Sequence, residues 1–77
     1  MCFMVQTVKN QEDVPLCIRI SGRTYDIRDR IKQFGALWKN ETKSWEVDYS
    51  NEVYNAIVSF LQTLTADVKE DTVVVIV

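Results

Sequence analysis

The chain has 77 residues, of which 47% are hydrophobic and 26% charged, with a formal net charge of −2, and this composition predicts one globular domain over residues 1–77. The sequence has no histidine and no glycine-rich loop that could hold a phosphate, and its acidic residues are scattered. We therefore expect no catalytic activity, no metal site and no cofactor. No apolar run reaches the roughly 18 residues of a membrane span and the first ten residues do not resemble a signal peptide. We therefore expect no membrane contact and a cytoplasmic location, in the host cytoplasm if the protein is viral.

Two strands are predicted in the first part of the chain. The apolar residues of 2–8 predict the first strand, and the polar cluster 10–13 predicts a turn. Residues 16–21 alternate, which predicts a second strand with one face formed by Leu16, Ile18 and Ile20.

The two cysteines, Cys2 and Cys17, are too few for a disulfide framework. Each lies in one of these apolar runs, so we expect free, buried thiols in a reducing compartment. A bridge stays open as an alternative, because pairing of the two strands could bring the thiols close.

Two helices are predicted, over 26–35 and 50–64, each from an apolar stripe at helical spacing. Thr24 or Asp26 could cap the first and Ser50 the second, and Tyr25 is expected to staple the start of the first helix rather than stack on a base. The stripes are Ile27, Ile31 and Phe34 in the first helix, and Val53, Ile57, Phe60, Leu61 and Leu64 in the second.

Between the helices, a hairpin with its turn at 40–43 places Trp38 opposite Trp45. The two indoles are either part of the core or a platform for a ligand. Ala36 and Val47 lie on the same face of the hairpin as the two tryptophans. This apolar face favours the core, and we predict that both tryptophans are buried.

The end of the chain predicts a polar connector over 65–71 and a strand over 72–77. The run of β-branched residues TVVVIV shows no alternation, which is typical of a strand covered on both faces. Two helices on one face of the sheet leave its other face open, so a homodimer through this strand is an expected assembly. The element order predicts an α+β fold, a small mainly antiparallel sheet with two helices packed on one face.

Charge is distributed unevenly along the chain. Residues 19–43 carry seven basic and three acidic side chains, a net +4, whereas residues 44–77 carry one basic and six acidic, a net −5. Such a local basic patch can bind phosphates in an acidic protein, although an ordinary solvated surface would show the same charges. The residues expected to contact nucleic acid are Arg23, Arg28, Lys32, Lys39 and Lys43.

The segment 20–47, ISGRTYDIRDRIKQFGALWKNETKSWEV, contains a tyrosine before a basic helix, then Gly-x-x-Trp and a second tryptophan after a polar turn. It resembles the small strand–helix–hairpin module of phage and plasmid proteins and is distantly similar to the HARP domain of annealing helicases. The resemblance implies an α+β fold and, for HARP-like modules, DNA binding. The chain departs from the pattern at Phe34, where leucine is usual, and at Leu37, where glycine or a basic residue is common. The matching positions are Tyr25, Ile31, Lys32, Gly35, Trp38 and Trp45.

Two functional hypotheses follow. The first is a small non-enzymatic module, phage- or plasmid-encoded, that associates with DNA or RNA through its basic helix and hairpin. The second is a small viral-type protein that binds and modulates or inhibits a host protein, such as a polymerase, a nuclease or a defence complex. Leu37 is the expected partner contact, because its neighbours on the outer hairpin face are polar.

Overall fold

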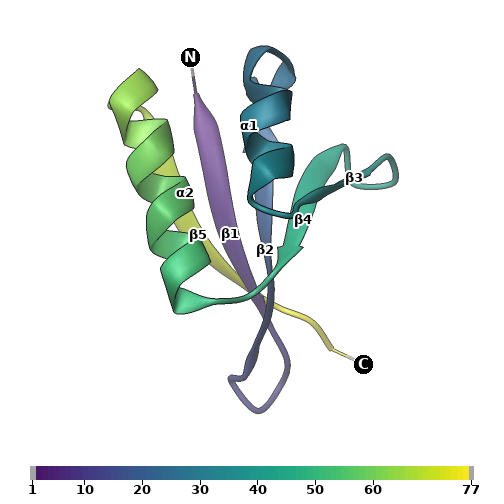
Figure 1. Ribbon diagram of the computed structural model, residues 1–77. Coiled ribbons are helices and arrows are strands. Elements are labelled where there is room, and N and C mark those ends of the chain that lie inside the picture. The colour runs from purple at the N-terminus through teal and green to yellow at the C-terminus, as the bar shows by residue number, and fades with distance from the viewer. Residues whose placement is uncertain (1, 77) are drawn as a thin grey trace.

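The computed structural model describes residues 2–76, which form one mixed β-sheet with two α-helices (Figure 1). The strands are β1 (Phe3–Lys9), β2 (Pro15–Gly22), β3 (Leu37–Lys39), β4 (Ser44–Asp48) and β5 (Val68–Val74). Their order across the sheet is β3-β4-β2-β1-β5. The pairs β1–β2, β2–β4 and β3–β4 are antiparallel, whereas β1 and β5 run parallel. The α+β class with a mainly antiparallel sheet is therefore confirmed.

The helices lie close to their predicted positions. A 3₁₀ turn (Tyr25–Ile27) leads into α1 (Arg28–Gln33), and α2 covers Asn51–Leu64. Gly35 follows α1 with a φ of +91°, as expected for a residue that ends a helix. Neither helix, within residues 2–76, is long and apolar enough to cross a membrane.

Of the predicted caps, Ser50 is in place, whereas the N-cap of α1 is Ile27 and not Thr24 or Asp26. Ser50 is the N-cap of α2 and Thr24 precedes the 3₁₀ turn, yet neither side chain bonds to the helix backbone. Thr24 has a different role, because its hydroxyl accepts a hydrogen bond from the indole of Trp45.

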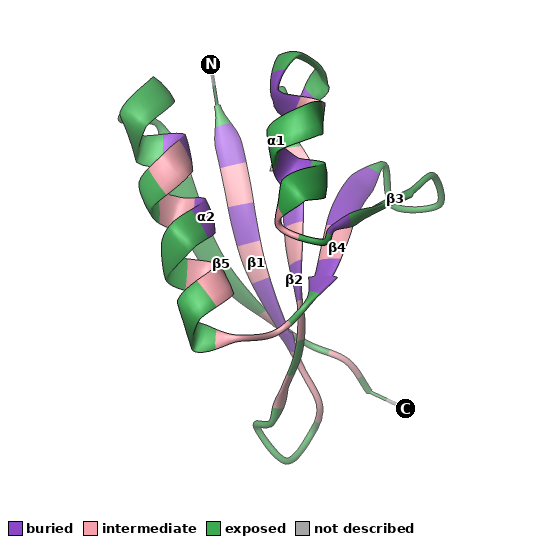
Figure 2. Cartoon of the chain, in the orientation of Figure 1, coloured by how far each residue is buried: buried purple, intermediate pink, exposed green. Residues whose placement is uncertain are grey.

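The core lies on the side of the sheet where Figure 1 draws both helices. Sheet residues alternate between buried and half-buried along β1 and β2 (Figure 2), as the pleat of a strand requires. Each fully buried large apolar side chain contributes about 1.5–3 kcal/mol relative to exposure. Leu16 and Leu64, predicted on apolar faces, are 47% and 41% exposed, because both lie at the end of their elements. The fully or almost fully buried apolar side chains are Phe3, Val5, Ile18, Ile20, Ile31, Ile57 and Leu61.

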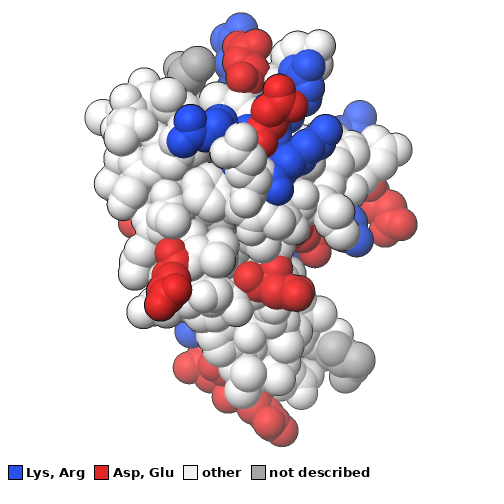
Figure 3. Space-filling model, viewed as in Figure 1, with Lys and Arg blue, Asp and Glu red and all other residues white. Residues whose placement is uncertain are grey.

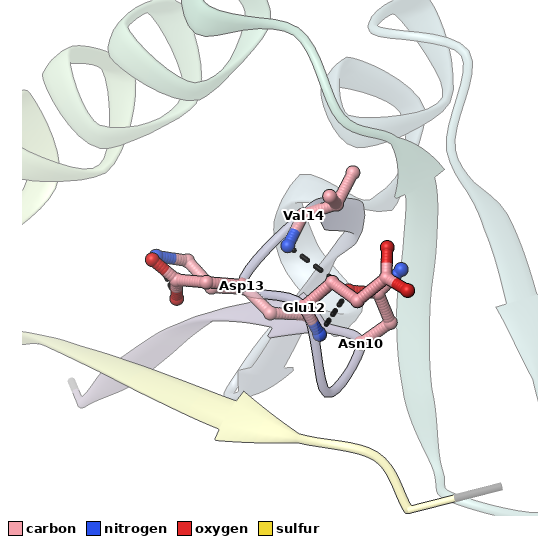
Figure 4. A network of polar contacts seen from close by, with 5 residues as sticks. Asn10, Glu12, Asp13 and Val14 are labelled. Atoms are coloured by element: carbon pink, nitrogen blue, oxygen red, sulfur yellow. Dashed lines mark hydrogen bonds and ion pairs between the residues drawn. The ribbon is translucent and has the colours of Figure 1, made fainter.

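The predicted turn at 10–13 connects β1 to β2 and is stabilised by backbone hydrogen bonds and by the side chain of Asn10 (Figure 4). The Asn10 side-chain oxygen accepts hydrogen bonds from the backbone N–H groups of Glu12 and Val14, at 2.9 and 3.0 Å. Asp13 adopts a positive φ of 66°, which Asp tolerates better than most residues. Its carboxylate also pairs with the Lys9 ammonium at 3.2 Å.

Gly22 ends β2 at a close backbone crossing. Its φ is +109°, and a Cβ added there would lie 2.3 Å from the backbone oxygen of Cys2. Glycine is therefore required at this position, and it directs the chain into the loop that carries Arg23, Thr24 and Tyr25.

The last strand departs from the prediction. β5 begins at Val68 and not at residue 72, because the backbone N–H of Phe3 bonds to the Asp67 carbonyl and Phe3 pairs with Val68. The strand lies at the sheet edge beyond β1, so the expected cover on both faces is wrong. Val74 and Ile76 are 55% and 82% exposed, and Val77 lies outside the described residues.

The cysteines are free, as predicted, but they are not buried. Cys2 is exposed and Cys17 half-buried. In the β1–β2 ladder Cys17 lies opposite Val8, whereas Cys2 directly precedes Phe3 at the other end. Five residues of strand span about 17 Å, well beyond the ~7 Å between Cα atoms that a disulfide tolerates.

Tyr54 connects α2 to the edge strand. Its hydroxyl donates a hydrogen bond of 2.5 Å to the Glu70 carboxylate on β5. Burial, and then the hydrogen bond and the charge of Glu70, raise the pKa of Tyr54 to about 12. The folded protein therefore favours the neutral phenol more strongly than the unfolded chain does.

We predict an alkaline loss of stability that depends on Tyr54. Its folded pKa of about 12 lies above the value of about 10 in an unfolded chain. Its contribution to the free energy of unfolding is therefore complete below pH 10 and is lost as the pH rises from about 10 to 12. Urea unfolding across this range should show a shallower fall for Tyr54→Phe than for wild type, whereas Tyr25→Phe should behave as wild type. Equal slopes for all three proteins would contradict the assignment.

Candidate functional site

The two tryptophans meet across the β3–β4 hairpin, as the sequence predicts. Trp38 lies directly opposite Trp45 in the strand register. Their ring centroids are 5.3 Å apart with an angle of 65° between the planes, an edge-to-face contact. Such a pair contributes about 0.5–1.5 kcal/mol beyond the area that it buries.

Trp45 is the buried member of the pair. It is 6% exposed and lies opposite Ile20 of β2, within the core. Its indole Nε1–H donates a 3.1 Å hydrogen bond to the hydroxyl of Thr24, which is itself 7% exposed. The bond satisfies a buried donor and attaches β4 to the loop that precedes α1.

Trp38 is not buried, which corrects the prediction for this residue. Its side chain is 46% exposed. The reason is its position, because β3 is a three-residue strand at the edge of the sheet and all its residues are exposed. The sequence offered the core and a ligand platform as alternatives for both indoles. In the structure Trp45 belongs to the core, whereas Trp38 is exposed as a platform would be.

Trp38 and Trp45 both border two surface hollows. The first has a volume of about 540 Å³ and lies toward the loop before α1. The second has a volume of about 400 Å³ and lies toward the end of α1. The first is also lined by Gly22, Arg23, Thr24, Tyr25 and Arg28, and the second by Lys32, Gly35, Ala36 and Leu37.

Cationic groups lie over the rings of this region. The Arg28 guanidinium carbon is 4.2 Å from the centroid of the Tyr25 ring, and its Nη1 donates a 2.7 Å bond to the Tyr25 carbonyl. The Lys32 ammonium lies 6.0 Å from the Trp45 ring centroid. Tyr25 is 73% exposed beneath Arg28, so the prediction that it staples the helix start is wrong. The i, i+3 spacing of Tyr25 and Arg28 is the sequence signal that could have revealed this stack.

Together these side chains form one surface, here called the aromatic–basic surface, made of Arg23, Tyr25, Arg28, Lys32 and Trp38. In Figure 3, Lys and Arg gather in the upper half of the molecule, where Figure 1 draws α1, and acidic side chains dominate the lower half. Asp26 and Asp29 are also exposed near α1 and reduce the positive charge there.

The other predicted contact residues lie elsewhere. Side chains alternate along β3, so Leu37 and Lys39 point to the opposite face of the hairpin from Trp38. Both border a third hollow of about 570 Å³, and Leu37, which is 66% exposed, also reaches the edge of the Lys32 hollow. Lys43 lies in the hairpin turn with a φ of 51° and lines neither tryptophan hollow. Of the five predicted cations, Arg23, Arg28 and Lys32 line hollows that both tryptophans border, whereas Lys39 shares a hollow of about 490 Å³ with Trp38 but not with Trp45.

A small polar cluster of Cys17, Arg19 and Glu46 lies on the outer face of the sheet, and its thiol is not activated. The Cys17 thiol lies 3.7 Å from Glu46, and burial and then this carboxylate raise the pKa of the thiol. A raised pKa keeps the thiol protonated and therefore a weak nucleophile. The Arg19 Nε lies 3.7 Å from the other Glu46 oxygen, an ion pair without a hydrogen bond.

Within residues 2–76, no three Cys, Asp or Glu side chains lie close enough together to hold a metal ion. Comparison of the chain with protein-family models, with curated proteins and with solved structures finds no significant match.

The two tryptophans should differ sharply in their contribution to stability. Trp45→Ala should lower the free energy of unfolding by about 3–5 kcal/mol, because it removes a large buried aromatic side chain. Trp38→Ala should cost less, because nearly half of its side chain is already exposed, and about 0.5–1.5 kcal/mol of its loss comes from the edge-to-face contact with Trp45. Urea unfolding followed by circular dichroism measures both. Equal losses in the two variants would show that the rings are not divided between core and surface.

Proposed function

We propose that this protein is a small nucleic-acid-binding module that contacts its ligand through the aromatic–basic surface. The observation that carries the proposal is the position of Trp38. It is a large ring, 46% exposed, that borders three hollows, one lined also by Arg23 and Arg28, a second by Lys32 and a third by Lys39. Aromatic rings beside cations match the two parts of a nucleotide, its base and its phosphate.

The charge distribution supports the same ligand. Three cations surround the tryptophan pair, whereas residues 44–77 carry a net −5. The acidic part of the chain would repel phosphates, so the ligand is confined to one side of the molecule. Asp26 and Asp29 lie close to the cations, and we therefore expect weak binding that tolerates many sequences.

A second candidate is a protein partner, favoured by a different observation. β5 is an edge strand with exposed Val74, and Ile76 follows it at 82% exposure. An exposed apolar edge of this kind can pair with a strand of another chain or of a second copy. This candidate predicts that association depends on β5 and is insensitive to changes at Arg23 or Lys32.

Charge reversal on the aromatic–basic surface tests the proposal. Arg23→Glu combined with Lys32→Glu should abolish measurable binding of fluorescent DNA and RNA at low salt. Both side chains are exposed, so the fold should be unaffected. Wild-type binding should weaken with salt at a log–log slope of about −2 to −3, the value for three phosphate contacts. Fluorescence anisotropy titrations at several salt concentrations measure both effects.

Arg30→Glu is the matched control. Arg30 is on the same helix, but its guanidinium lies over the Phe60 ring, 5.0 Å from the centroid, and away from the tryptophan hollows. Reversal there should leave most of the affinity and the salt slope intact. If the control and the double variant lose the same affinity, the effect is one of general charge and not of this surface. If the wild type binds none of the probes, the proposal is discarded.

A further inference from the structure

We infer that the nucleic acid is bound as a single strand, with an unpaired base stacked on Trp38. This inference rests on the proposed function and adds the class of ligand, because cations alone would bind a duplex as readily as a single strand.

The first argument is that Trp38 is held in place and still open to a ligand. Its ring contacts Trp45 edge to face, with centroids 5.3 Å apart. Trp45 is fixed in turn by burial and by its bond to Thr24. The exposed indole therefore has a rigid support, and a base that stacks on it need not first order a flexible side chain.

The second argument concerns what a duplex can offer to such a ring. In a double helix the faces of the bases are stacked on one another, and a protein meets base edges and phosphates. A double helix therefore presents no free base face on which an exposed indole could stack. Unpaired bases, by contrast, stack readily on aromatic side chains.

The third argument concerns the shape and charge around the ring. α1 has six residues and carries Asp29, and Asp26 precedes it in the 3₁₀ turn. Such a short element with two acids is poorly suited to enter a major groove between two phosphate strands. Arg23 and Arg28 in one hollow and Lys32 in the other instead suit one backbone that passes across Trp38.

The experiment compares ligands that have the same phosphates but differ in their bases. The probes are a labelled oligothymidylate, an abasic oligonucleotide of the same length, and a duplex of the same length. Wild type should bind the oligothymidylate about 5- to 150-fold more tightly than the abasic strand, the range for one stacked base. Trp38→Ala should bind both single strands equally and retain the salt dependence of the wild type.

Two further variants separate stacking from a general structural effect. Trp38→Phe keeps an aromatic ring and should restore most of the preference for bases. Leu16→Ala is the matched control, because Leu16 is 47% exposed, almost the same fraction as Trp38, and lies outside both hollows. It should behave as wild type, and thermal melting should show that all variants are folded.

The outcomes distinguish this inference from the proposed function. If wild type binds the abasic strand or the duplex as tightly as the oligothymidylate, the inference is overturned and phosphate binding by the surface stands. If Trp38→Ala keeps the preference for bases, stacking on this ring is also overturned. If wild type binds none of the probes, both the inference and the proposed function are discarded.

Discussion

The hydrogen bond from the Trp45 indole to the Thr24 hydroxyl is the contact on which the candidate site depends. It joins two segments that are 21 residues apart in the chain, the second strand of the hairpin and the loop that leads into α1. Both partners are buried, so loss of either would leave a polar group without a partner in the core, at a cost of about 1–3 kcal/mol. Through this bond the hairpin brings Trp38 to the loop that carries Arg23 and Tyr25. The surface is therefore assembled by tertiary packing and not by any one element.

The same arrangement would allow an acidic protein to bind the anionic ligand proposed above. A net charge of −2 is unfavourable for a nucleic-acid binder if it is spread evenly. Here the fold places Arg23, Arg28 and Lys32 around one aromatic pair, within a short distance of one another in the chain and in space. Long-range repulsion by the acidic remainder would keep non-specific affinity low. Contact would then depend on the combination of the exposed Trp38 ring with the cations of the two hollows.

Much of the fold could be predicted from sequence, because its signals are local. The hairpin register follows from the polar turn at 40–43 and from strict alternation, and it placed Trp38 opposite Trp45 correctly. The helix α2 follows from its apolar stripe and Ser50. β5 was not predictable in this way. Its first half, VKED, is polar, and it becomes a strand because β1 offers an unpaired edge.

Part of the candidate site was also predictable from the sequence, because some of its signals are local. Arg28 and Lys32 share one side of a helix by spacing alone, and both do reach the tryptophan pair. The exposure of Trp38 follows from the position of β3 at the sheet edge, which depends on the order of the strands and which no local pattern encodes.

The proposed site requires Trp45 to be an internal anchor and Trp38 to be its exposed neighbour. The most direct measurement follows the two indole N–H signals in a ¹⁵N–¹H nuclear magnetic resonance spectrum, assigned with Trp38→Phe and Trp45→Phe. The Trp45 signal should be protected from hydrogen exchange, and the Trp38 signal should exchange rapidly. On titration with a single-stranded oligonucleotide, the Trp38 signal should shift and the Trp45 signal should remain protected. Two signals that exchange alike, or a titration that perturbs neither indole while β5 residues shift, would contradict the proposed site.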